Sequence, residues 1–130
     1  MKKEHAERNE QLNDKLIAEN IYKDWIVTTA FYSAIHYAEY RIFSASRIFF
    51  GKTVRNLEEA HFAIPYQNRK SRHETRGALV KIYLYNVQVQ YDFLRKQSQT
   101  ARYIDYRVSQ SLATQAKGCL NKIKEESLKS

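Results

Sequence analysis

The sequence predicts an all-α fold, an up-and-down bundle of four long helices plus one short helix. Its 130 residues include only three Gly and one Pro, and no Asn-Gly or Asp-Gly pair marks a hairpin turn. Residues 24–50 contain neither Gly nor Pro, and their apolar side chains fall on nearly every side of a helical wheel. A helix that is apolar all round is buried by its neighbours, so we expect this segment to be the central helix of a single domain, residues 1–130.

Residues 1–20 are expected to form a helix that flanks a bundle core of residues 21–127. The flanking segment is polar and has a thin apolar seam at Leu12, Leu16 and Ile17. Its start, MKKEHAERNEQLNDK, lacks the apolar core of a signal peptide. The charges within residues 24–50 also argue against a membrane span. We therefore expect a cytoplasmic protein with no membrane partner.

A short helix is predicted soon after the central one. Asn56 and Glu59 have the spacing of a capping box, in which two side chains bond the backbone N–H groups at a helix start. This helix extends to about residue 62. The loop that follows, residues 63–70, contains the only proline of the chain, Pro65.

Two more long helices complete the predicted bundle. Ser71 and Glu74 form a second capping box, and apolar residues then recur every three or four positions, which predicts a helix from Arg72 to about Gln97. After a turn at residues 98–100, the last helix covers about residues 101–127. A helix from Arg72 that lies antiparallel to the whole central helix would place its start and residues 102–103 at opposite poles of the bundle.

The charge of the chain points to an anionic partner. Twenty-two Lys and Arg against fourteen Asp and Glu give a formal net charge of +8. Nucleic acid is the commonest partner of such a chain. The alternative is that the basic excess only keeps the protein soluble.

A basic pole is expected where the central helix ends and the next long helix starts. Around His61 and His73 it gathers Lys52, Arg55, Arg69, Lys70, Arg72 and Arg76. Nearby arginines favour the neutral form of a histidine, which suits a general base, and an arginine can stabilise the charge of a phosphorane-like transition state. These two residue types suffice for RNA cleavage through the 2′-hydroxyl without a metal. The alternative is that His73 is an ordinary surface residue of a capped helix.

Other polar residues are assigned to the framework. Asp24 and Arg102 start two helices at the pole opposite the basic one, where we expect them to pair, with Trp25 and Tyr103 beside them. His36 lies on the most buried helix and is expected to be a core histidine with a hydrogen-bond partner. The chain has no phosphate-binding glycine loop, no nucleophile elbow and only one cysteine, Cys119. We expect neither a metal site nor a cofactor.

Three segments resemble the HEPN domains of bacteria and archaea. They are DWIVTTAFYSAIHYAEY in the central helix, RHETR at the start of the next long helix, and SQTARYIDY. The resemblance covers roughly residues 20–110. It implies a HEPN-like helical bundle that forms a homodimer and is linked to RNA cleavage, to toxin–antitoxin pairs and to defence.

The resemblance also suggests residue roles. Active HEPN domains carry an arginine, four to six further residues and then a histidine, and Arg55 and His61 have five residues between them. In that scheme one motif from each subunit builds a composite site. His61 or His73 is the general acid or base, and Arg55 and Arg76 contact phosphate. The RNA backbone is held by Lys52, Arg69, Lys70 and Arg72.

Two other functions remain open from the sequence. The same pole could bind a nucleotide or a partner protein without chemistry, since many HEPN-like domains lack the motif and act beside a nucleotidyltransferase. An antitoxin is the other expected kind of protein partner. The third reading is a purely structural dimerisation domain, in which Asp24, Arg102 and Tyr103 are framework residues only.

Overall fold

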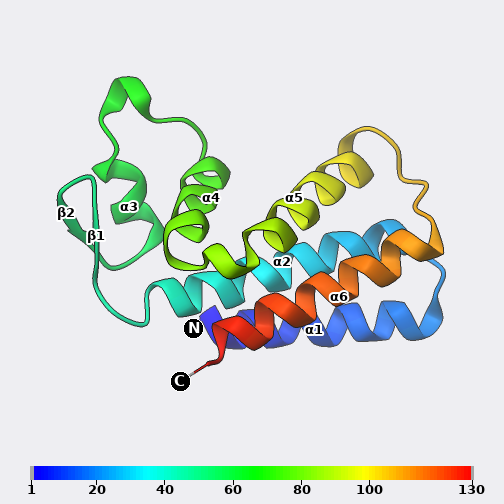
Figure 1. Cartoon of the computed structure of the whole chain (residues 1–130). Coiled ribbons are helices and arrows are strands. Elements are labelled where there is room, and N and C mark those ends of the chain that lie inside the picture. The colour runs from blue at the N-terminus through cyan, green and yellow to red at the C-terminus, as the bar shows by residue number, and fades with distance from the viewer. Residues whose placement is uncertain (1, 130) are drawn as a thin grey trace.

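The computed structural model describes residues 2–129, so Met1 and Ser130, the ends of the predicted domain, lie outside it. This part of the chain is mostly helical, as predicted, and holds one small hairpin (Figure 1). The α-helices are α1 (Lys2–Glu19), α2 (Lys23–Ile42), α3 (Leu57–Ala63), α4 (Arg72–Tyr83), α5 (Gln88–Tyr103) and α6 (Gln110–Ser127). The strands are β1 (Arg47–Phe49) and β2 (Lys52–Val54), and the 3-10 turns are η1 (Tyr66–Asn68) and η2 (Tyr85–Val87).

Helix α2 is the centre of the fold, which confirms the role predicted for this segment. It packs against α1, α4, α5 and α6, and Figure 1 shows α1 and α6 running alongside it. Small polar side chains let α1 approach closely. The Ser33 hydroxyl donates to the carbonyl of Ala6 at 2.8 Å, and the Asn13 amide donates to the carbonyl of Ile26 at 2.7 Å.

The central helix ends at Ile42, so the predicted extent to Phe50 is wrong. Side chains that follow the helix bind the carbonyl groups at its end. The Ser44 hydroxyl donates to the carbonyl of Arg41 at 2.8 Å, and Nε of Arg47 donates to the carbonyl of Ile42 at 2.6 Å. These bonds satisfy carbonyls that a longer helix would have bonded to its own backbone.

The apolar residues after α2 form a hairpin instead of more helix. Phe49 pairs with Lys52, so Phe50 and Gly51 make a two-residue loop. Both loop residues have positive φ, 50° and 74°. That is the backbone of a type I′ turn, the commonest way to close a two-residue hairpin. The sequence analysis missed the turn because phenylalanine stands where asparagine or aspartate usually signals it.

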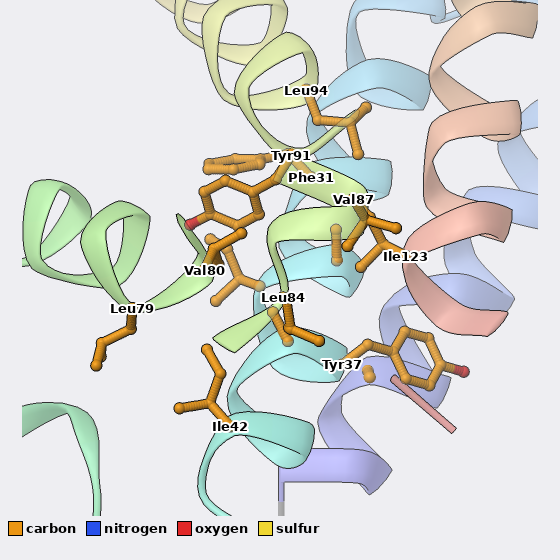
Figure 2. Packing of buried hydrophobic residues seen from close by; sticks show 14 of the residues in the cluster. Phe31, Tyr37, Ile42, Leu79, Val80, Leu84, Val87, Tyr91, Leu94 and Ile123 are labelled. Carbon is orange, nitrogen blue, oxygen red and sulfur yellow. The ribbon is translucent and has the colours of Figure 1, made fainter. Parts of the chain in front are cut away.

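The predicted helix from Arg72 to Gln97 is also wrong, because it breaks at η2. The backbone at Leu84 leaves the helical region, with φ −134° and ψ 39°. The side chains of Leu84 and Val87 are buried on either side of this break, and Figure 2 shows both within the packed core. Burying both side chains compensates for the helical hydrogen bonds that the break interrupts.

Helix α5 then extends through the predicted turn at residues 98–100 and ends at Tyr103. The Ser98 side chain is buried within this helix. Helix α6 starts at Gln110, later than the predicted residue 101, and the side chain of Ser109 caps it by accepting a hydrogen bond from the backbone N–H of Leu112 at 3.1 Å. The two expected capping side chains, Asn56 and Ser71, accept the hydrogen bonds predicted for them.

The core joins both halves of the chain. Phe31 of α2 meets Tyr91 of α5 edge to face, with ring centres 5.8 Å apart, and Figure 2 shows Val80, Leu84 and Leu94 around them. Within residues 2–129 no helix has the length and apolar character needed to cross a membrane.

Candidate anion-binding site

A cleft of about 320 Å³ opens between the start of α4 and the C-terminal half of α5. We call it the α4–α5 cleft. Phe31 of α2 contributes to its wall, and the other lining residues are Ser71, His73, Glu74, Arg95, Ser98, Gln99, Arg102 and Tyr103. The break at η2 separates α4 from α5, and Figure 1 shows the two helices leaving it like the arms of a V, with residues of both lining the cleft.

The cleft joins His73 and Arg102, which the sequence analysis placed at opposite poles. That placement is wrong for a simple geometric reason. The predicted straight helix from Arg72 to Gln97 would be about 39 Å long at 1.5 Å per residue, with His73 near its start and Arg102 beyond its end. Because α4 and α5 are separate helices that fold back on each other, both residues line the same cavity.

Two arginines of α5 supply the positive charge of the cleft. Arg95 and Arg102 are seven residues apart, a spacing that puts them two turns apart on the same side of the helix. Arg95 extends to α4, where its Nη1 lies 3.8 Å from the position that a Cβ would take at Gly77, an ordinary van der Waals distance. The sequence analysis did not select Arg95, although this spacing relative to Arg102 was visible.

The guanidinium of Arg102 is held by aromatic rings rather than by a carboxylate. Its central carbon lies 5.4 Å from the ring centre of Tyr32 and 4.9 Å from that of Tyr103. Its Nη2 also donates to the Tyr103 hydroxyl at 2.9 Å. Within residues 2–129, neither Arg102 nor Arg95 forms an ion pair. Glu74, which also lines the cleft, is 4.0 Å from the ammonium group of Lys70.

A buried ion pair positions the histidine of the cleft. Glu39 of α2 is buried, and its Oε2 accepts a hydrogen bond from Nε of Arg76 at 2.8 Å. The same guanidinium lies 3.1 Å from Nδ1 of His73 through its Nη1. Because a guanidinium can only donate, Nδ1 must accept, and the neutral ring then carries its proton on Nε2.

The surroundings of His73 keep it neutral. Partial burial is the largest cause that lowers its pKa, and the charges of Arg76, Arg95 and Arg102 lower it further. Its ring stacks on Phe31 with the centres 6.0 Å apart. At neutral pH the cleft therefore presents two guanidinium groups and one imidazole N–H donor. Such a set of donors suits an anion with several oxygen atoms, such as a phosphate group.

The basic residues predicted to hold RNA are largely occupied by other contacts. Arg69 donates to the backbone carbonyls of His61, Phe62 and Ile64 and so closes the end of α3. Arg72 forms two hydrogen bonds with the carboxylate of Glu58. Lys52 and Arg55 are exposed, but neither lines the α4–α5 cleft.

His61 has a structural environment. Its side chain is 5% exposed, and its Nδ1 lies 2.8 Å from the hydroxyl oxygen of Thr75. Thr75 in turn donates to the carbonyl of Ser71 at 3.3 Å. These contacts tie α3 to α4. The spacing of Arg55 and His61 that resembles the HEPN motif thus links an exposed arginine to a buried histidine.

The expected framework residues are arranged differently from the prediction. Asp24 and Arg102 form no ion pair within residues 2–129, because Arg102 faces the cleft and stacks on Tyr32. Trp25 is 51% exposed and Tyr103 is 70% exposed. His36 is half-buried, and its ring centre lies 5.2 Å from that of His5.

Comparisons with protein-family models, with curated proteins and with solved structures found no match for this chain. Within residues 2–129, no three His, Cys, Asp or Glu side chains are grouped so that they could hold a metal ion. The α4–α5 cleft and the charge of the chain are the features of this molecule that indicate a function.

Proposed function

We propose that this protein binds RNA through its phosphate groups, and that the α4–α5 cleft is the binding site. One observation carries the proposal: Arg95 and Arg102 converge on His73 in a single cleft, and no carboxylate of residues 2–129 pairs with either guanidinium. Arg95 is half-buried and Arg102 is exposed, so both guanidinium groups can be reached by an anion from solution. A phosphate would supply the anionic partner that Arg95 and Arg102 lack, since Glu74, a carboxylate that lines the cleft, lies beside Lys70 instead.

The net charge of +8 supports a polyanion over a small anion. The proposal keeps the HEPN-like bundle and the homodimer suggested by the sequence resemblance, and with them a role in a toxin–antitoxin or defence system. It moves the binding site from the predicted basic pole to the α4–α5 cleft. A nucleotidyltransferase or an antitoxin remains the expected kind of protein partner.

RNA cleavage without a metal is a second candidate, favoured by the lowered pKa of His73 among three arginines. The hydrogen bond from Arg76 weighs against it. That bond places the ring proton on Nε2, whereas a general base needs an unprotonated nitrogen facing the 2′-hydroxyl. Cleavage would require the Arg76 contact to break or the ring to change tautomer. Binding requires neither, so it is the function that the geometry supports best.

Binding is tested by fluorescence anisotropy with a labelled RNA oligonucleotide at low salt. Arg102→Ala is expected to weaken binding about tenfold or more, since a hydrogen bond between charged groups contributes roughly 1.5–3 kcal/mol. Arg8→Ala is the matched control, because it removes the same charge from an exposed position on α1. Equal losses in both variants would show that the cleft is not the site.

Cleavage is tested by incubating the protein with RNA in EDTA, beside His73→Ala and His61→Ala. Cleavage by the wild type that His73→Ala abolishes would establish the second candidate. Intact RNA with the wild type, together with salt-sensitive binding, would leave a binding protein without catalysis.

A further inference from the structure

Tyr103 is an aromatic side chain placed at the cleft without being part of the core. It lines the α4–α5 cleft at the end of α5, and 70% of its surface is exposed. Arg102 covers only part of the ring, at 4.9 Å from its centre. A large aromatic surface left open beside two cations is the pairing found in proteins that bind single-stranded nucleic acid, in which bases stack on the aromatic residue and phosphates contact the cations.

The cation next to Tyr103 is held in position. Arg102 lies between Tyr32 and Tyr103 and is bonded to the Tyr103 hydroxyl. These contacts restrict a side chain that is otherwise flexible, so less conformational entropy is lost when it binds a phosphate. They also fix the distance between the charged group and the ring. Because Arg102 and Tyr103 are adjacent in sequence, the charge and the ring are close enough to contact one nucleotide together.

The size of the cleft limits what can enter it. A volume of about 320 Å³ is near the lower end of the range for small-molecule pockets, roughly 300–1,000 Å³. A duplex keeps its bases stacked inside and paired, so it can present its phosphates to the cleft but not a base. Only an unpaired nucleotide can place its phosphate and its base in this cavity together.

From these observations we infer that the α4–α5 cleft holds one unpaired nucleotide of an RNA strand. Its phosphate contacts Arg95 and Arg102, and its base stacks on the ring of Tyr103. This inference rests on the proposed function and narrows it, because it makes the protein selective for single-stranded RNA. Stacking uses the face that every base has, so the cleft discriminates weakly among the four bases.

The test compares a labelled single-stranded 12-mer RNA with the same sequence in a blunt duplex, by anisotropy at one salt concentration. Tyr103→Ala is expected to weaken single-strand binding by about tenfold, the effect of losing one stacked base. Tyr103→Phe keeps the ring and loses only the hydrogen bond from Arg102, so it is expected to bind clearly more tightly than Tyr103→Ala, with at most a few-fold loss relative to the wild type. Tyr85→Ala removes a tyrosine of nearly equal exposure, 71%, in η2, before the start of α5, and is expected to change nothing.

Three outcomes separate the inference from the proposed function. If the wild type prefers the single strand, and Tyr103→Ala is the only tyrosine variant that loses this preference, both the inference and the proposed function are supported. Equal binding of strand and duplex, with Tyr103→Ala unchanged and Arg102→Ala weakened, overturns the inference and leaves RNA binding intact. If the wild type binds neither RNA, both fail. Because Tyr103 is exposed, its variants should fold, and circular dichroism verifies this.

Discussion

Two clusters of charged residues lie on different sides of this molecule, and they differ in how their charge is balanced. The first, which we call the Glu10 cluster, joins α1, α2 and α6 through Glu10, Asp14, Tyr37, Lys117 and Lys124. Each of its lysines has a carboxylate partner, with Nζ of Lys117 2.8 Å from Asp14 and Nζ of Lys124 3.1 Å from Glu10. The second cluster is the α4–α5 cleft, whose arginines have none.

Tyr37 connects α2 to the Glu10 cluster. Its hydroxyl donates to Glu10 at 2.7 Å. Burial raises the pKa of this hydroxyl most, and the hydrogen bond and charge of Glu10 raise it further. The tyrosine therefore remains a donor at any ordinary pH. We infer from this contrast that a basic residue paired with a carboxylate stabilises the bundle, whereas one without such an ion pair is available to bind an anion.

The largest effect on RNA affinity is expected from removing the positive charges of the α4–α5 cleft. The double variant Arg95→Ala, Arg102→Ala should weaken RNA binding about 100-fold or more, because two hydrogen bonds between charged groups are lost at roughly 1.5–3 kcal/mol each. The measurement is the dissociation constant for a labelled single-stranded RNA. The control, Lys117→Ala with Lys124→Ala, removes the same charge from the Glu10 cluster. A similar loss of RNA affinity in the control would show that the two clusters do not differ in RNA binding.

A substitution in the Glu10 cluster should lower the stability of the fold and leave RNA binding unchanged. Glu10→Ala leaves the Tyr37 hydroxyl and the ammonium group of Lys124 without their carboxylate, in a part of the surface where Glu10 is only 14% exposed. We expect the free energy of unfolding to fall by about 1–3 kcal/mol, measured by urea denaturation. RNA affinity of the folded variant should equal that of the wild type. A variant of unchanged stability would show that the cluster does not hold the helices together.

The sequence was sufficient to predict the central element of the fold but not the element that forms the cleft. The apolar faces of α2 and the capping side chains Asn56 and Ser71 are local signals, so the helices they mark were predicted. The break at Leu84 gives no such signal, because the apolar spacing continues through it and only tertiary packing favours burying Leu84 and Val87. Without that break, Arg102 and His73 cannot be placed together.

The candidate site was therefore predicted in part. His73 and Arg76 were selected from local composition; His73 lines the cleft, and Arg76 is hydrogen-bonded to it from outside the lining. Arg69 and Arg72 were selected on the same basis, yet their partners are a set of carbonyl groups and the carboxylate of Glu58. Composition shows which residues are basic. It does not show which of them the fold neutralises.

The pH dependence of RNA binding tests whether His73 contacts the bound phosphate. Its pKa in the free protein is lowered, so the ring is neutral at pH 7. A bound phosphate favours the imidazolium and raises this pKa, although protonating Nδ1 costs the hydrogen bond from Arg76. Binding then takes up a proton, and affinity should rise at most a few-fold as pH falls from 8 towards 5. Oligouridine is the probe, since its bases do not titrate in this range. His73→Gln keeps an N–H donor that does not titrate and should give a flat profile. An equally steep profile in His73→Gln would assign the effect to another group.

The smallest effect is expected at Arg72, which marks the boundary of the site. This exposed arginine is bonded to Glu58 and does not line the cleft. Exposed ion pairs contribute little to stability. Arg72→Ala should therefore leave both the melting temperature and the RNA affinity close to those of the wild type. A loss of affinity as large as that of Arg95→Ala would extend the binding surface to the predicted basic pole.

The salt dependence of RNA binding tests the central claim most directly. For a single strand, the slope of log affinity against log salt changes by about 0.7 for each phosphate contact. Because Arg95 and Arg102 contact the same phosphate, the cleft variant Arg95→Ala, Arg102→Ala should reduce the slope by about 0.7, while Lys117→Ala with Lys124→Ala should leave it unchanged. Equal slopes in all three proteins, or a reduction only in the lysine variant, would contradict the assignment of RNA binding to the α4–α5 cleft.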